Sequence, residues 1–147
     1  MKKWLKMIKN EKGLTLIELL AVVVILGIIA AIAIPSISGI IDNSKKDAHV
    51  SNALMIISTA KLAVASNDEI TKDIETTGVS LAQLEKAGYL DAIPKDPDGK
   101  DGSTYTPTSN VKYINKVYYI NLNSASRDIG NKTESELVSK GREIFEK

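Results

Sequence analysis

The chain lacks cysteine entirely and has a single histidine among its 147 residues. Without thiols it can form neither a disulfide framework nor a thiolate metal site, and it has no cysteine nucleophile. One histidine argues equally against a multi-histidine metal centre. The 19 basic and 18 acidic residues nearly balance, which excludes a strongly basic nucleic-acid binder and an acidic disordered tail as descriptions of the whole chain. The serines and threonines lack a glycine-rich elbow or a base partner, so we expect no enzyme.

The near-neutral average conceals three different segments. Residues 1–13 carry five lysines and one glutamate, a net charge of +4. Between Leu14 and Ile34 every residue is apolar except Thr15 and Glu18. The chain from Leu14 onward has 14 basic and 17 acidic residues, a net charge of −3. A basic tip, an apolar segment and a mildly acidic body therefore follow one another.

The apolar segment is long enough to cross a membrane. As a helix it would measure about 31 Å, which matches the hydrocarbon core of a bilayer. The rest of the chain is too short to bury a helix that is apolar on all sides. The positive-inside tendency places the lysine-rich tip in the cytoplasm and the C-terminal body outside. We therefore expect a single-pass membrane segment.

A secretory signal peptide is an alternative interpretation. Residues 31–33, with the sequence Ala-Ile-Ala, resemble a signal-peptidase site, and cleavage after Ala33 would release a secreted soluble binding domain. Against this, the apolar run exceeds the usual ~7–15 residues, and Pro35 follows closely after the cut.

Glu18 is the residue that a simple anchor does not explain. A carboxylate inside a membrane helix costs roughly 2.5–3.5 kcal/mol, so it needs a partner. Lys12 is six residues away and lies off the same helical face. Cleavage after Gly13 would give Leu14 an α-amino group four residues before Glu18.

These residues resemble the N-terminus of type IV pilins and the related pseudopilins. The resemblance covers residues 1 to about 41 and combines a short basic leader, Gly13, Glu18 and the late Pro35. The family more often has phenylalanine at the position of Leu14. The resemblance implies that a prepilin peptidase cuts between Gly13 and Leu14 and that Leu14 is then N-methylated. It also implies that Glu18 pairs with the N-terminal amine of a neighbouring subunit, with Thr15 beside that contact.

Gly27 and Pro35 are the expected helix-breaking positions. Pro35 has no N–H and clashes with the carbonyl of Ala31, so it should kink or locally open the helix. In filaments of the family that this chain resembles, the helix between these positions can melt. A simple kink at the membrane surface is the alternative.

Beyond Pro35 the helix is predicted to continue as an amphipathic segment over residues 36–66. Its apolar stripe comprises Val50, Ala53, Leu54, Ile57, Ala60 and Val64. Residues 67–78 are polar and read as a loop. Capping boxes at Ser80–Gln83 and Thr133–Glu136 predict a short helix over 81–87, closed by Gly88, and a C-terminal amphipathic helix that reaches Phe145.

Residues 111–122 alternate like one or two strands with a turn at Asn115 and Lys116. The alternation assigns Val111, Tyr113, Val117 and Tyr119 to one face and Ile114, Tyr118, Ile120 and Leu122 to the other. Tyr105 is expected in a preceding strand. The fold class is therefore α+β, with a long kinked N-terminal helix packed on a small antiparallel sheet. The domains are a leader (1–13), an apolar helix (14–35), its amphipathic continuation (36–66) and a head (67–147).

The head offers few candidate sites. Asp96, Asp98 and Asp101 are weak calcium candidates, because turn-forming aspartates explain the same pattern, and we expect no cofactor. His49 lies among polar residues and is predicted to be a surface side chain. A basic patch that could contact DNA would comprise Lys112, Lys116, Arg127, Lys132 and Lys140, although scattered lysines usually form a solvated face.

The resemblance implies a structural subunit of a type IV pilus-like filament, serving motility, adhesion or DNA uptake. Before assembly it would sit in the cell membrane, surrounded by lipid, and afterwards in a homopolymer at the cell surface. The implied partners are the prepilin peptidase, an inner-membrane platform protein and an assembly ATPase. A pseudopilin of a type II secretion or competence system is the alternative. A head without cysteine loosely suggests a Gram-positive origin.

Overall fold

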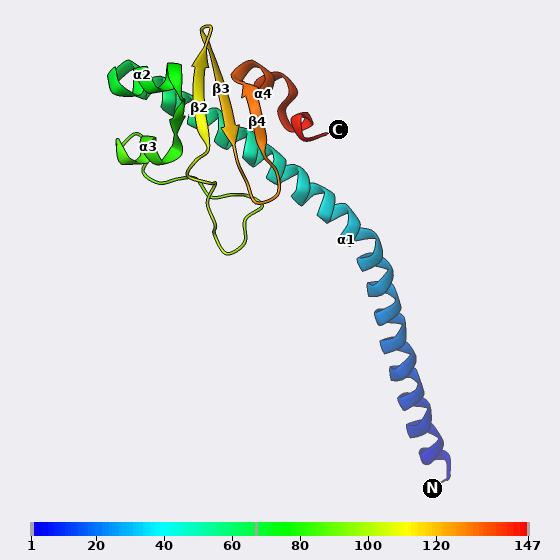
Figure 1. Cartoon of the computed structure of the whole chain (residues 1–147). Helices are drawn as coiled ribbons and strands as arrows, with labels where there is room; N and C mark the ends of the chain where they lie inside the picture. Colours follow the sequence, from blue (N-terminus) through cyan, green and yellow to red (C-terminus); the bar gives the residue numbers. More distant parts are fainter. Residues whose placement is uncertain (1, 67, 147) are drawn as a thin grey trace. The chain divides into compact units, whose positions relative to one another are not determined.

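The computed structural model describes the backbone of residues 2–66 and 68–146, and the side chains of residues 15–66 and 69–146. The chain forms two compact units, which divide between Asp42 and Asn43. One helix, α1 (Lys2–Ser66), runs through both units (Figure 1). The fold is α+β, as predicted, because α1 carries a small antiparallel sheet in the second unit.

Among the described residues, the first unit consists of helix alone. Within the part of the chain that the structure describes, α1 from Thr15 onward is the one helix long and apolar enough to cross a membrane. It continues as a helix through Gly27 and Pro35, so neither residue ends it in this structure. Pro35 removes a single backbone donor, and the rest of the hydrogen-bond ladder persists. Nearby, the Ser38 hydroxyl donates to the Ile34 carbonyl at 3.0 Å, a bond that often bends helices. Melting of this stretch in a filament stays a prediction.

The second unit (Asn43–Lys147) includes the last part of α1, and from here on we call this whole unit the head. It contains four strands in the spatial order β1-β2-β3-β4, all antiparallel to their neighbours. The strands are β1 (Val79–Ser80), β2 (Asn110–Ile114), β3 (Val117–Leu122) and β4 (Ile129–Thr133). The helices of the head besides α1 are α2 (Asp68–Thr76), α3 (Leu81–Lys86) and α4 (Glu134–Lys140), followed by the 3-10 helix η1 (Gly141–Phe145). Strands β1 and β4 were not predicted from the sequence.

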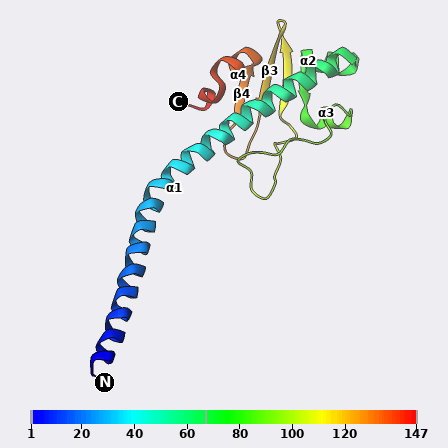
Figure 2. The same cartoon turned by 180° about the vertical axis from the view of Figure 1, so that it is seen from behind.

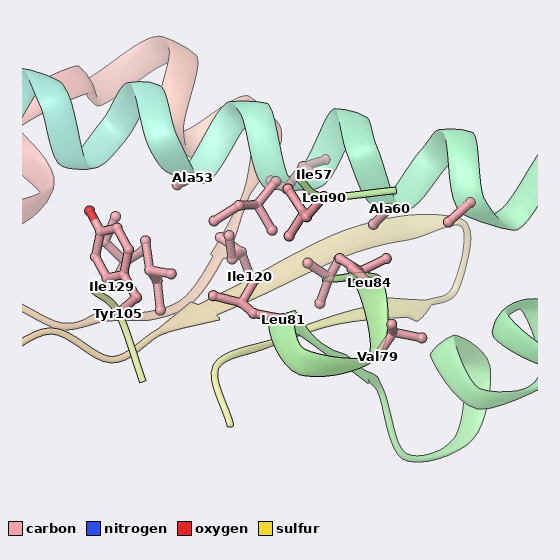
Figure 3. Packing of buried hydrophobic residues seen from close by; sticks show 14 of the residues in the cluster. Ala53, Ile57, Ala60, Val79, Leu81, Leu84, Leu90, Tyr105, Ile120 and Ile129 are labelled. Carbon is pink, nitrogen blue, oxygen red and sulfur yellow. The ribbon is translucent and has the colours of Figure 1, made fainter. Parts of the chain in front are cut away.

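The head core lies between α1 and the sheet (Figure 3). The predicted stripe of α1 is confirmed: Val50, Ala53, Ile57 and Ala60 are buried, and Leu54 and Val64 are partly buried against the core. The stripe is wider than predicted, since Ile56 and Ala63 are also buried. The remaining buried apolar residues come from α2, α3, α4, all four strands and the segment between α3 and β2, whereas η1 contributes only the partly buried Ile144 and Phe145.

The predicted loop over 67–78 is wrong for the described residues 68–76, which form α2; Asn67 itself lies outside the described residues. Although most of the segment is polar, Ile70 and Ile74 are one helical turn apart, and both are buried in the core. Burial of this pair stabilises a helix whose other faces are solvated. The two predicted capping boxes are both present, at Ser80 and at Thr133.

The predicted hairpin is confirmed, but its predicted faces are wrong. Strands β2 and β3 are joined at Asn115 and Lys116, both at positive φ. The register pairs Val111 with Ile120 and Tyr113 with Tyr118, so these residues share the core face with Leu122. Because the turn contains two residues, each odd-numbered residue of β2 lies opposite an even-numbered residue of β3, and paired residues point to the same face of the sheet. The prediction is wrong because it assigns odd-numbered residues of both strands to one face, as if the alternation continued unchanged through the turn.

Two further predictions about the head need correction. Tyr105 lies outside every named strand; its backbone N–H donates to the Pro94 carbonyl, and its side chain is buried. The C-terminal α-helix ends at Lys140 rather than near Phe145, because Gly141 has a φ of +53° and the chain continues as a 3-10 turn.

Candidate functional site

The rod, which we define as α1 from Thr15 to Ile41, is an apolar helix without a partner inside its own unit. Its large apolar side chains are more than half exposed, from 51% for Ile41 to 71% for Ile32. A helix that is apolar all round is stable only in lipid or among other apolar helices. The rod therefore requires one of these two surroundings.

The predicted processing and assembly residues lie at the start of the rod. The structure gives helical backbone at Gly13 and Leu14, but the side chain of Leu14 is outside the part that it describes. Thr15 and Glu18 are both exposed, and Glu18 is flanked by the exposed Ile17 and Leu19. One carboxylate thus lies on an otherwise apolar surface, about 6 Å along the helix axis from Leu14.

The calcium candidates do not form one site. Asp96 is buried and accepts hydrogen bonds from the Asp98 and Ala125 backbone N–H groups and the Ser124 hydroxyl, at 2.8–3.0 Å. Asp101 is exposed in a turn at φ +52°. Among the described side chains there is no group of three or more His, Cys, Asp or Glu residues placed to hold a metal ion.

Two cationic side chains and a histidine surround the second aspartate of this loop, Asp98. Asp98 accepts from His49 Nε2 at 3.1 Å, and its carboxylate lies 3.4 Å from both Lys45 Nζ and Arg127 Nε. The charge of Asp98 is therefore balanced from within the chain. Burial by itself would raise the pKa of Asp96, but the hydrogen bonds from Ala125, Asp98 and Ser124 together lower it below its usual value.

The prediction that His49 is a surface residue is wrong. Its side chain is fully buried, with Nδ1 2.7 Å from the Tyr105 hydroxyl and Nε2 3.1 Å from Asp98. The Tyr105 hydroxyl also accepts from Asn52 Nδ2 at 3.3 Å, and its burial raises the tyrosine pKa to about 12. His49 therefore connects α1 to the loop over residues 91–109 through its contacts with Asp98 and Tyr105. The sequence contained a signal for this burial: His49 precedes Ala53 by four residues, which places both on the same, buried face of α1.

The basic patch predicted from the sequence is partly neutralised. Arg127 is paired with Asp98, and Lys132 with Glu136 at 3.6 Å. Two of the five basic side chains thus form ion pairs within the head. These contacts do not support DNA binding by the patch.

The N-terminal residues match a known motif. The prokaryotic N-terminal methylation motif is found at residues 8–34. Type II secretion system core protein G of Escherichia coli (strain K12) is 25% identical over 141 residues, covering 90% of this chain and 92% of that protein. The fimbrial protein of Moraxella nonliquefaciens is 34% identical over 97 residues, which is 60% of each chain. Together these similarities support the type IV pilin and pseudopilin family for this chain.

A further relative has the same name as the E. coli protein. Type II secretion system core protein G of Vibrio cholerae is 28% identical over 111 residues, covering 70% of this chain and 76% of that protein. No solved structure matches the chain. The methylation motif contains Gly13, Leu14, Thr15 and Glu18, the residues predicted to direct processing and assembly. The similarity to these proteins implies filament self-assembly and processing by a peptidase.

Proposed function

We propose that this pilin-family chain is the subunit of a type IV pilus-like filament and is cleaved between Gly13 and Leu14. The observation that carries the proposal is the methylation motif at residues 8–34 on a rod whose apolar side chains have no cover inside their own unit. A membrane supplies that cover before assembly, and the rods of other copies supply it afterwards. The same surface therefore serves in both states without exposure to water.

Cleavage supplies the partner that Glu18 lacks on the rod surface. The new amine of Leu14 keeps its positive charge after N-methylation, and in the filament it pairs with Glu18 of a neighbouring copy. A buried charge that loses its opposite charge typically costs ~3–5 kcal/mol, so mispaired copies are disfavoured and the pair sets the axial register. The lysine-rich leader stays in the cytoplasm and the head lies outside.

The chain performs no chemistry in this proposal. Force and insertion come from an inner-membrane platform protein and an assembly ATPase, and a prepilin peptidase removes the leader. We expect the head to need no cofactor, because His49, Lys45 and Arg127 already surround Asp98.

A pseudopilin of a secretion or competence system is the second candidate. It is favoured by the relative named type II secretion system core protein G, which aligns over 90% of this chain. Abundance separates the two candidates. A major pilus subunit should dominate the protein sheared from the cell surface, whereas a pseudopilin should be scarce there.

Intact mass and N-terminal sequence of the membrane and surface forms test the proposal. We expect a chain that starts at Leu14 and carries one additional methyl group. Glu18→Gln should be processed normally but lost from filaments, and Thr15→Ser is the matched control that should assemble. A start at Ile34 would show a secreted domain instead. An uncut N-terminus, or normal assembly of Glu18→Gln, would refute the cleavage or the pairing.

A further inference from the structure

One face of the sheet in the head lies away from the core. Figure 2 shows α1 in front of the sheet, and in Figure 1 the opposite side of β2 and β3 lies toward the viewer. We call this opposite side of β2 and β3 the outer face, because the residues that alternate with it belong to the core. It consists of three cross-strand pairs: Asn110 with Asn121, Lys112 with Tyr119, and Ile114 with Val117.

The polar side chains of the outer face are free to bind a ligand. Within the part of the chain that the structure describes, no hydrogen bond or ion pair engages the amides of Asn110 and Asn121, the Tyr119 hydroxyl or the Lys112 ammonium group. All four of these residues are partly exposed. The outer face therefore presents two amides, one phenol and one cation that only solvent satisfies.

The charge of the outer face is positive. Lys112 lies on it, Lys116 lies in the turn that joins its two strands, and none of its six residues is acidic. Lys61 and Arg127 are each paired with a carboxylate, whereas Lys112 and Lys116 have no ion pair among the described residues. Gly78 leaves room for the Lys112 side chain, since an added Cβ would fall 2.7 Å from its Cγ. This surface attracts anions.

The neighbouring strands add polar groups at the border of the outer face. Ser80 of β1 and Thr133 of β4 lie beside it in the sheet, and both cap the helices that follow them. Through Thr133 the Glu136 carboxylate reaches this border, where Lys132 Nζ lies 3.6 Å from it. The border therefore adds hydroxyl groups and a balanced ion pair, and the positive charge of the outer face persists.

The chemistry of the outer face fits an acidic polysaccharide. An asparagine amide both donates and accepts hydrogen bonds, as the hydroxyl groups of a sugar do. Tyr119 combines an apolar ring with a polar end, which matches the apolar face and the hydroxyl rim of a sugar ring. The Lys112 ammonium group can form a charge-assisted hydrogen bond with a sugar carboxylate. Sheet faces bind oligosaccharides in other proteins, such as those with an OB-fold.

Nucleic acid is the other anionic polymer that a positive face could bind. Tight binding to DNA neutralises many phosphates, about 6–10 in strong cases, but the outer face and its turn together offer two lysines. Single strands stack successive bases on several aromatic side chains, whereas the outer face has Tyr119 alone. Uncharged hydrogen-bonding groups outnumber the cations here, so the observations favour a sugar polymer.

We propose that the outer face binds an acidic polysaccharide, with Tyr119 stacked on a sugar ring and Lys112 paired with a sugar carboxylate. The two asparagines bond to sugar hydroxyls. Residues two apart on a strand are separated by about 7 Å, so the three pairs can follow more than one sugar ring. Ile114 and Val117, which are 46% and 38% exposed, extend the contact with apolar surface. Binding by one head does not require the proposed filament, but a filament with many heads multiplies weak contacts.

Binding to immobilised hyaluronate, in which every second sugar carries a carboxylate, tests the proposal. The full chain in detergent is passed over this surface and over a dextran surface, which is a neutral control. We expect retention on hyaluronate that weakens as salt is added, and none on dextran. Short hyaluronate oligosaccharides in solution should compete for the chain.

Substitutions locate the binding to the outer face. Lys112→Gln should weaken the affinity for hyaluronate about tenfold. Lys140→Gln is the matched control, because it removes the same charge from an exposed residue of α4. Tyr119→Thr keeps a residue that favours strands and should weaken the affinity about threefold to tenfold, whereas Tyr119→Phe keeps the ring and should retain more binding. Unchanged hydrogen exchange of the β2 and β3 amides shows that each variant retains the sheet.

Each outcome decides the matter. Equal affinities of Lys112→Gln and Lys140→Gln would mean that general charge attraction suffices, and retention on dextran as strong as on hyaluronate would remove the role of the anion. If single-stranded DNA binds more tightly than hyaluronate and displaces it, the outer face is a nucleic-acid site. Any of these results overturns the proposal. If the chain binds hyaluronate as described but never appears in filaments, the proposed function fails and this inference stands.

Discussion

Replacing Asp96 by asparagine should release the loop over residues 91–109 from the rest of the head. Each carboxylate oxygen of Asp96 accepts a backbone hydrogen bond, from Asp98 N–H to Oδ1 and from Ala125 N–H to Oδ2. The Ser124 hydroxyl lies within 3.0 Å of both oxygens. An asparagine side chain offers only one acceptor oxygen. Whichever way its amide turns, its NH₂ group faces one of the two N–H groups.

The expected cost follows from these contacts. An unsatisfied buried N–H group costs about 1–3 kcal/mol, and hydrogen bonds to a charged acceptor are roughly twice as strong as neutral ones. We therefore expect Asp96→Asn to destabilise the loop by about 2–4 kcal/mol. At tenfold for each 1.4 kcal/mol, this corresponds to about 30-fold to 1,000-fold faster hydrogen exchange of its amides.

Hydrogen exchange with mass spectrometry on the full chain in detergent measures this effect. The informative amides are those of Asp96, Tyr105 and Thr106, which donate to the carbonyls of Ser103, Pro94 and Asn123. Asp101→Asn is the matched control, because Asp101 is exposed in the same loop and asparagine tolerates its positive φ. Equal exchange rates in Asp96→Asn and the control would refute the assignment of Asp96 as the loop's anchor.

The same carboxylate predicts how the loop responds to acid. The folded pKa of Asp96 lies below its ordinary value, and the unfolded value is about 3.9. The contribution of Asp96 to stability is therefore complete above about pH 4 and is lost as the pH falls through the lower, folded pKa. Loop protection of the natural chain should decline in that acidic window. Asp96→Asn should lack this part of the decline.

Two further substitutions test local features of the head, each by the urea midpoint of the full chain in detergent. Gly78→Ala should cost about 1–3 kcal/mol more than Gly88→Ala. Both glycines have positive φ, but only at Gly78 does an added Cβ fall 2.7 Å from Lys112 Cγ, whereas at Gly88 no atom lies within 4 Å. Equal midpoints would show that the close approach is harmless. Thr133→Ala should cost about 0.5–2 kcal/mol, because the Thr133 hydroxyl accepts from Glu136 N–H at the start of α4. Thr133→Ser should retain most of that stability, and a loss as large as that of Thr133→Ala would contradict the capping role.

Local signals predicted much of the fold. A capping box involves residues three apart, so the starts of α3 and α4 could be read directly from the sequence. The helical spacing of the α1 stripe and the turn between β2 and β3 are equally local. The methylation segment is contiguous, so its residues can be identified from the sequence alone.

The features that were missed depend on partners far away in the chain. The buried state of His49 requires Asp98 and Tyr105, which are 49 and 56 residues away. The helix α2 is stabilised by two isoleucines in a mainly polar segment, and its composition resembles that of a loop. The strand β4 is only five residues long and contains Gly130, Asn131 and Lys132, which gives little alternation to detect.

The sequence separations around α1 have a consequence for export. The head half of α1 is made early, yet Lys61 meets Glu134 only 73 residues later, and the buried Leu137 lies close to the C-terminus. Contacts of such long range form late, because the intervening chain must first be closed into a loop. The head therefore cannot complete its core until the chain has been made as far as Leu137. In the proposed orientation, with the head outside, these residues must also have crossed the membrane. Until then, the apolar face of α1 that will meet the sheet is uncovered.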